Sequence, residues 1–212
     1  LEIANAAEFI GARISSDARR EYTLLSSETL TKHFPTALEL VADLVKRPTF
    51  PEHELERVRR EHLTDLRRSK DDPTTVAERL IAGLVFSKDS GYGHYIFGTE
   101  DSASAFSRED LQKLFQGVYT PGRATLVVVG DTNLEEVTQQ AQYLLGDWSG
   151  EGSYVPQEAV NTNGSMPDTT IYLVDQPGAA QSVIRALQPT VPRKHPDYFG
   201  LTLVNYVFGG QY

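Results

Sequence analysis

The sequence contains no cysteine, only one methionine and only one tryptophan. The absence of cysteine excludes disulfides, thiolate metal sites and cysteine nucleophiles from this chain. No apolar run approaches the roughly 18 residues that suggest a membrane-spanning helix. Basic residues are also scarce, because 20 Lys and Arg stand against 29 Asp and Glu, for a net charge of −9. This charge argues against a nucleic-acid-binding protein, since binding phosphates requires cationic side chains.

The chain does contain enough apolar material for a core. Of its 212 residues, 40% are hydrophobic and 23% are charged, proportions typical of a globular protein. Leu1 is not an initiator methionine, and the sequence stops at residues 208–212 directly after an apolar run. We therefore expect both ends of the sequence to lie within a longer protein.

Apolar residues repeat with helical spacing in several segments. Within residues 34–48, Leu38, Val41, Ala42 and Val45 form one apolar stripe. Such stripes, together with capping signals such as Ser107 with Asp110, predict a chain rich in amphipathic helices. The other helices are expected at residues 2–10, 51–70, 73–86, 107–119, 133–145 and 196–208.

Other segments favour β-strands. Residues 12–18 and 20–30 are short and rich in Ser and Thr, and we expect them to pair as antiparallel strands. Residues 123–131, RATLVVVGD, are the clearest strand, because a continuous apolar run suits the interior of a sheet. Two further strands are expected at residues 169–176 and 181–189.

The segment HELER, which begins at His53, differs by one residue from the zinc-peptidase motif H-x-x-E-H. In that motif two imidazoles at i and i+4 share a helix face and bind zinc beside a carboxylate base. Here the i+4 residue is Arg57, a permanent cation that cannot ligate zinc. His62 lies nine residues from His53, too far to replace it. We interpret the segment as a charged helix with i,i+4 ion pairs. The expected pairs are Glu56–Arg60 and Arg57–Glu61.

The remaining candidates for chemistry are weak. His33, His94 and His195 stand alone without ligand-like spacing, which favours surface or loop positions. Residues 127–133, VVVGDTN, could suggest a phosphate site at a helix N-terminus, but they contain one glycine and no lysine. No G-x-S-x-G motif is present. Residue chemistry alone therefore predicts no catalytic site.

The order of segments is more informative. Residues 38–73, 98–137 and 146–148, followed by 172–189 and 196–212, together resemble the insulinase/pitrilysin (M16) zinc metallopeptidases. Relatives of that family include the mitochondrial processing peptidase and the respiratory-complex core proteins. The pattern Y-x-P-x-x-A-T-L-V-V-V-G-D, which begins at Tyr119, is the specific part of this resemblance.

The resemblance implies an α+β fold of the LuxS/MPP-like metallohydrolase type, with helices packed on a mostly antiparallel sheet and domains in tandem. Residues 1–150 would form the C-terminal part of one such domain, residues 151–168 a linker, and residues 169–212 the start of the next domain. Two such halves usually enclose a chamber around a peptide.

The resemblance also bears on the metal. In active members the H-x-x-E-H helix lies upstream of the position at which this sequence begins, and HELER falls on a later helix. That helix supplies a distal glutamate ligand in the pattern E-R-x-V-x-x-x-E. Laid on Glu56-Arg57, the ligand position falls on Leu63, and the nearest upstream acid, Glu61, is turned about 200° away. We expect no metal ligand here, with zinc in an active partner or an upstream segment. Only in an active enzyme would Glu61 be a ligand.

A possible substrate contact comes from an edge strand. Active members carry Asn-Ala on this strand, where the present sequence has Ser15-Ser16, whereas Glu21 and Thr23 match the family pattern. An edge strand can bind an extended peptide through its backbone whatever its side chains are. The alternative is a solvated sheet edge. The substrate-contact candidates are Ile14, Ser15, Ser16 and Asp17.

Three functions follow from the resemblance. In the first, the chain is an inactive half or subunit that binds peptide substrate and completes a chamber with a zinc-bearing M16-like partner. In the second, it belongs to an active zinc metalloendopeptidase whose H-x-x-E-H lies upstream. In the third, it is a structural assembly subunit like the respiratory core proteins. The compartment stays open, although similar family members suggest a bacterial periplasmic or extracytoplasmic setting.

Overall fold

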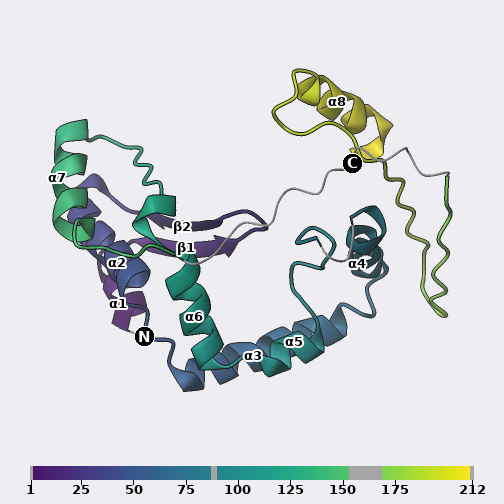
Figure 1. Ribbon diagram of the computed structural model, residues 1–212, viewed down its shortest axis with the longest axis horizontal. Helices are drawn as coiled ribbons and strands as arrows, with labels where there is room; N and C mark the ends of the chain where they lie inside the picture. Colours follow the sequence, from purple (N-terminus) through teal and green to yellow (C-terminus); the bar gives the residue numbers. More distant parts are fainter. Residues whose placement is uncertain (1, 87–89, 153–168, 211–212) are drawn as a thin grey trace. The chain divides into compact units, whose positions relative to one another are not determined.

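A computed structural model describes residues 2–86, 90–152 and 169–210 of the chain (Figure 1). The chain divides into two compact units, Leu1–Ser69 with Ile96–Glu158, and Lys70–Tyr95 with Ala159–Tyr212. They are called unit 1 and unit 2, and each is described by itself. Across the described residues, no helix combines the length and apolar character needed to cross a membrane.

Unit 1 begins with a helix, a hairpin and a second helix. Its first core is built on the second helix, where the predicted stripe buries Leu38 and Ala42, with Ala37 beside them. Lys46 at the end of this helix donates a hydrogen bond to the carbonyl of Leu144 (3.0 Å), which fastens a later helix to it. These elements are α1 (Glu2–Phe9), β1 (Arg13–Ala18), β2 (Thr23–Glu28), the short 3-10 turn η1 (Thr31–His33) and α2 (Phe34–Lys46).

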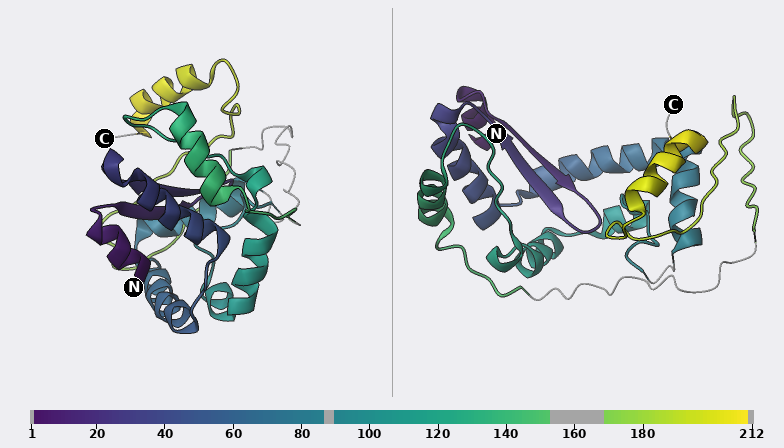
Figure 2. Two further views of the ribbon diagram at one scale, coloured as in Figure 1. Left: turned by 90° about the vertical axis from the view of Figure 1, so that its left-hand side faces the viewer. Right: turned by 90° about the horizontal axis from the view of Figure 1, so that it is seen from above.

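The hairpin confirms the expected antiparallel pairing. Its register places Ser15 opposite Ser26 and Ala18 opposite Thr23, so Ala18 and Thr23 flank the turn. Figures 1 and 2 show the two strands extending away from α1 and α2 as one long ribbon. Most residues of both strands are exposed, and only Ile14 and Leu25 are half-buried.

The second half of unit 1 is helical. Capping boxes start two of its helices, one between Thr99 and Ser102 and the expected one between Ser107 and Asp110. Asn133 caps the last helix by accepting a hydrogen bond from the backbone of Glu136. The elements are α3 (Glu52–Arg68), α5 (Glu100–Ala105), α6 (Arg108–Val118), the 3-10 turn η2 (Pro121–Arg123) and α7 (Leu134–Leu145).

Unit 2 contains α4 (Pro73–Val85), α8 (Tyr198–Asn205) and the π-helical turn η3 (Tyr206–Gly210). Asp72 caps α4 by accepting hydrogen bonds from the backbone N–H groups of Thr74 and Thr75, and Pro73 occupies the first turn, where a missing N–H costs nothing.

The other predicted strands are wrong for the described residues. Residues 123–131, 169–176 and 181–189 form no ladder there, and only β1 and β2 are paired. Val127 and Val129 in the first segment are 76% and 93% exposed. An apolar run supplies strand propensity, but a strand forms only where a neighbouring strand receives its backbone hydrogen bonds. The described fold is therefore mostly helical with a small two-stranded antiparallel sheet, and not the larger sheet expected. Most of the predicted linker, residues 153–168, lies outside the described residues.

Candidate functional site

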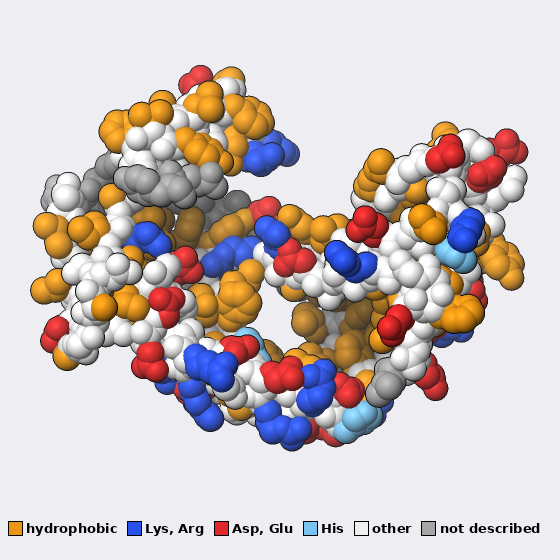
Figure 3. Space-filling model, turned by 180° about the vertical axis from the view of Figure 1, so that it is seen from behind, with side chains coloured by type: hydrophobic (Ala, Val, Ile, Leu, Met, Phe, Trp, Pro, Cys, Tyr) orange, Lys and Arg blue, Asp and Glu red, His pale blue; other side chains and the backbone are white. Residues whose placement is uncertain are grey.

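Helix α3 carries the segment HELER, and its sequence explains why it is helical despite few apolar residues. Acids occupy its first turn at Glu52 and Glu54, and bases occupy its last turn at Arg67 and Arg68. This order stabilises both ends of the helix dipole. Figure 3 shows Lys, Arg, Asp and Glu side chains alternating along the lower edge of the molecule, where α3 lies.

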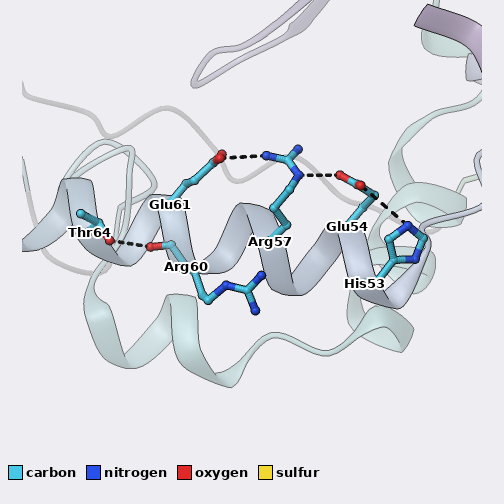
Figure 4. Close-up of polar contacts among 6 residues, drawn as sticks. All are labelled: His53, Glu54, Arg57, Arg60, Glu61 and Thr64. Carbon is cyan, nitrogen blue, oxygen red and sulfur yellow. Dashed lines mark hydrogen bonds and ion pairs between the residues drawn. The ribbon is translucent and has the colours of Figure 1, made fainter. Parts of the chain in front are cut away.

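Arg57 lies between two acids on one side of α3 (Figure 4). Its Nε donates to Glu54 Oε2 and its Nη1 donates to Glu61 Oε1, each at 2.8 Å. The expected Arg57–Glu61 pair is thus confirmed. The expected Glu56–Arg60 pair is wrong, because Glu56 accepts from Arg59 Nε at 3.1 Å, one position closer along the helix.

The hydrogen bond from Arg57 keeps the side chain of Glu54 negatively charged. The hydrogen bond from Arg57 lowers the pKa of Glu54 below its ordinary value, so the carboxylate stays ionised near neutral pH. His53 is 79% exposed and its Nε2 lies 3.7 Å from Glu54. The position that H-x-x-E-H would give to a second imidazole is therefore filled by a guanidinium that already holds both nearby acids.

The opposite side of α3 holds residues 97–106, a contact that sequence reasoning missed. Arg59 donates from Nη1 to the carbonyl of Ala103 and from Nη2 to the carbonyl of Phe106. These carbonyls end α5, so Arg59 supplies partners that the helix itself cannot provide. No side-chain pattern in the sequence signalled this contact, because the partners of Arg59 are backbone carbonyls.

His62 and Arg67 extend the same contact. The Nε2 of His62 lies 2.9 Å from the carbonyl oxygen of Phe97, and Arg67 Nε donates to Glu100 Oε2 at 2.8 Å. Leu66 lies between them in sequence and is 3% exposed. The polar side chains on this side of α3 thus act in packing, with Leu66 as their apolar anchor.

The two residues named for the distal ligand lie in different environments. Leu63 is half-buried, whereas Glu61 has a 64% exposed side chain and pairs with Arg57. Within residues 2–86, 90–152 and 169–210, no group of three or more His, Cys, Asp or Glu side chains is placed to hold a metal ion.

Strand β1 carries the predicted substrate contacts. Ile14 is half-buried, whereas Ser15, Ser16 and Asp17 are exposed. Within the described residues β1 pairs with β2 alone, so its outer edge has no ladder partner there. Asp17 accepts hydrogen bonds from Arg19, which neutralises the acid at the turn.

A shallow hollow lies beside the start of β1. It has a volume of about 750 Å³, and its lining includes Ile3 and Ala7 of α1 together with Arg13 and Ile14. Gly11 closes α1 with φ 64°, a left-handed conformation that suits glycine. The four candidates thus run from the edge of this hollow along the exposed strand.

The other candidates do not come together. His33 ends η1, His94 is exposed in a loop, and His195 accepts a hydrogen bond from the backbone of Asp197 at 3.2 Å. The turn after Val129 leads into α7, whose N-terminus is already capped by Asn133. No catalytic arrangement of these residues exists in the part of the chain that the structure describes.

Two family profiles match the chain. One, described as Peptidase M16 inactive domain, matches residues 105–212. The other, described as Insulinase (Peptidase family M16), matches residues 1–92.

Similar proteins include named peptidases. An uncharacterized zinc protease of Bacillus subtilis is 25% identical over 151 residues, which is 71% of this chain and 36% of that protein. The mitochondrial-processing peptidase subunit beta of Homo sapiens is 26% identical over 147 residues, which is 69% of this chain and 29% of that protein. An uncharacterized zinc protease of Mycobacterium leprae is 24% identical over 99% of this chain and 47% of its own length. The chain thus spans about a third to a half of these relatives.

Solved structures agree in fold. A peptidase M16 inactive domain from Pseudomonas fluorescens has a TM-score of 0.66 at 23% identity, covering 72% of this chain and 37% of that one. Pitrilysin has a TM-score of 0.63 at 15% identity, covering 75% of this chain and 17% of that one.

Proposed function

The chain belongs to the M16 peptidase family and has an M16-like fold, and from this we propose that it is a non-catalytic part of a peptidase assembly. In this proposal it completes a peptide-binding chamber with a zinc-bearing M16-like half or subunit. It supplies surface and a strand edge for the peptide. The named human relative, a processing-peptidase subunit, supports an arrangement built from more than one part.

The observation that carries the proposal is the arrangement of Arg57 between Glu54 and Glu61. A guanidinium stays protonated at any physiological pH. At about 4 Å in water it repels a divalent cation by about 2 kcal/mol, and by more where water is excluded. A metal bound to either acid would also have to displace a charge-assisted hydrogen bond. This side of α3 therefore does not fit zinc, and no catalytic step is assigned to it.

The residues of β1 provide a way to bind peptide without catalysis. A strand edge offers backbone N–H and C=O groups at every second residue, and an extended peptide can pair with them as a further strand. Ile14 contributes apolar contact at the hollow, while Ser15 and Ser16 leave the edge unobstructed. Recognition of this kind is tolerant of sequence, and the net charge of −9 favours basic peptides.

The domain arrangement is part of the proposal. Residues 1–150 would complete one α+β domain, with residues 169–212 beginning the next and residues 151–168 linking them. The composition of that linker, rich in Gly, Ser, Pro and Asn, supports the assignment. Limited proteolysis tests it, because first cleavage inside residues 151–168 is expected and first cleavage elsewhere would contradict it.

A second candidate is an active zinc metalloendopeptidase with its H-x-x-E-H upstream. The match of residues 1–92 to the insulinase family and the similarity to proteins named zinc proteases favour it. In that case Glu61 would have to leave Arg57 to become a ligand.

Metal analysis and peptide cleavage separate these functions. Zinc content of the purified full-length protein is measured for the wild type and for Glu61→Gln, with Glu135→Gln on α7 as a matched exposed control. Cleavage is then measured with and without the candidate partner. Activity that needs both chains, with zinc unaffected by Glu61→Gln, supports the chamber. Stoichiometric zinc lost specifically in Glu61→Gln supports the second candidate. Absence of peptide binding and cleavage in every pairing would indicate a structural assembly role.

A further inference from the structure

The turn end of the β1–β2 hairpin is hydrogen-bonded to Tyr119, the residue that follows α6, across 96 positions of sequence. Thr23 Oγ1 and the hydroxyl oxygen of Tyr119 lie 2.9 Å apart. Thr23 is the first residue of β2 and pairs with Ala18, the last residue of β1. The contact therefore acts at the end of the hairpin farthest from α1 and α2.

The ring of Tyr119 is itself held in place. It stacks on Phe115, with ring centroids 4.9 Å apart and an interplanar angle of 14°. Phe115 in turn meets Phe50 edge-on at 5.7 Å. Phe50 has φ 43°, a conformation uncommon outside glycine, so its loop is held by its surroundings. Arg108 contributes by donating to the carbonyl of Thr49 at 2.9 Å.

The turn end of the hairpin is not held in place by buried side chains. Thr23 and Leu24 are exposed, Leu24 by 52%, and the half-buried residues Ile14 and Leu25 lie further along the strands. A two-stranded hairpin without a covered face is marginally stable in water. Polar contacts at the turn end thus have a large influence on where the strand edge lies.

We propose that Tyr119 is a positioning residue for peptide binding, which holds the outer edge of β1 extended through Thr23. The proposal rests on the proposed function, since it concerns the same edge at Ile14–Asp17. Tyr119 does not touch the peptide. It reduces the conformational freedom that the hairpin would lose when a peptide pairs with it, and so it strengthens binding.

A double-mutant cycle in the full-length protein, assembled with its partner, tests this. The probe is a fluorescein-labelled unstructured peptide rich in valine, serine and arginine. The same peptide with N-methylated backbone amides shows whether binding uses backbone pairing. Tyr119→Phe removes the hydroxyl and keeps the stacked ring, and Thr23→Val removes the other partner. Tyr143→Phe on α7, where Tyr143 is 84% exposed, is the matched control.

Each single variant is expected to raise the Kd by about threefold to tenfold, the usual effect of one hydrogen bond. The double variant should weaken binding no further, because both changes remove one interaction. Thr23→Ser keeps the hydroxyl that Thr23→Val removes, so it should bind the peptide as tightly as the wild type does. Hydrogen exchange at residues 14–17 should quicken in Tyr119→Phe and stay unchanged in Tyr143→Phe.

Two negative outcomes are distinguishable. If the wild type binds the probe and Tyr119→Phe binds equally well, the positioning role is wrong and the proposed function survives. If the wild type does not bind the probe at all, peptide binding at the edge of β1 and the positioning role of Tyr119 are both wrong.

Discussion

Helices α3 and α8 differ in what surrounds them. On the packing side of α3, Arg59, His62 and Arg67 have partners within unit 1, and Leu66 is buried beside them. Within residues 198–209, which cover α8 and most of η3, no residue is buried, and Phe199, Leu203 and Val207 are 66%, 69% and 87% exposed. Figure 3 shows hydrophobic side chains gathered over this part of the chain. A helix that is apolar all round is typical of a buried position.

This difference between α3 and α8 shows that the charge of a helix does not indicate whether the helix has a structural or a functional role. The charged α3 resembles a metal-binding helix in sequence, yet its charges serve ion pairs and backbone contacts. The apolar α8 suggests a core helix, yet nothing else in the described part of unit 2 covers it. The contacts of each helix, more than its composition, determine how a substitution acts.

The largest effect is expected for Leu66→Ala. Removing this 3% exposed side chain should lower the free energy of unfolding by about 2 to 4 kcal/mol, through lost burial and the cavity left behind. The matched change Leu203→Ala on α8 should stay within about 0.5 kcal/mol. Urea unfolding measures both. A loss at Leu203 as large as that at Leu66 would break the comparison, since it would mean that α8 is covered in the protein.

Arg59→Met is expected to have the next largest effect. Methionine keeps much of the buried stem but leaves the carbonyls of Ala103 and Phe106 without their donors. The expected loss is about 1 to 3 kcal/mol, the usual cost of unpaired polar groups. The exposed neighbour Arg60 provides the control, and Arg60→Met should change the unfolding midpoint little. Equal effects at the two positions would contradict the role of α3 as the support for residues 97–106.

Much of this could be predicted from the sequence. Capping residues such as Ser107 and the apolar stripe around Leu38 predicted the helices correctly, because both signals depend only on residues close together in the sequence. The hairpin followed from two short β-leaning segments. The role of Arg59 could not be foreseen, since its partners are backbone carbonyls that no side-chain pattern reveals. The apolar Val58 is 49% exposed, because the packing side of α3 is turned toward Arg59 and His62.

The candidate site was predicted in part. The ion pair of Arg57 with Glu61 follows from i,i+4 spacing, whereas the second bond to Glu54 depends on side-chain conformation. The strand at residues 123–131 failed for a different reason. Its apolar run indicates β propensity, but pairing requires a neighbouring strand, which is not a property of the segment itself.

Arg57→His tests whether the guanidinium alone separates α3 from a metal-binding helix. The variant has imidazoles four residues apart, at position 57 and at His53, with Glu54 beside them. At zinc concentrations tenfold above the Kd, binding should stabilise the protein by about 1.4 kcal/mol. Thermal unfolding with zinc and with a chelator measures this. Arg60→His, seven residues from His53, should gain nothing, and the same absence in Arg57→His would show that more than one residue prevents metal binding.

The smallest effect is a pH dependence on the exposed side of α3. Because Arg57 lowers the pKa of Glu54 in the folded protein, this carboxyl binds protons less readily than it does in the unfolded chain. Its contribution to stability is therefore present above the ordinary glutamate pKa of about 4.3 and is lost as the pH falls through the lower folded value. The difference in unfolding midpoint between the wild type and Glu54→Gln should shrink over that window. The same comparison made with Arg57→Met in both proteins removes the donor of this bond. An equal trend with and without Arg57 would mean that the Arg57 bond contributes nothing in solution.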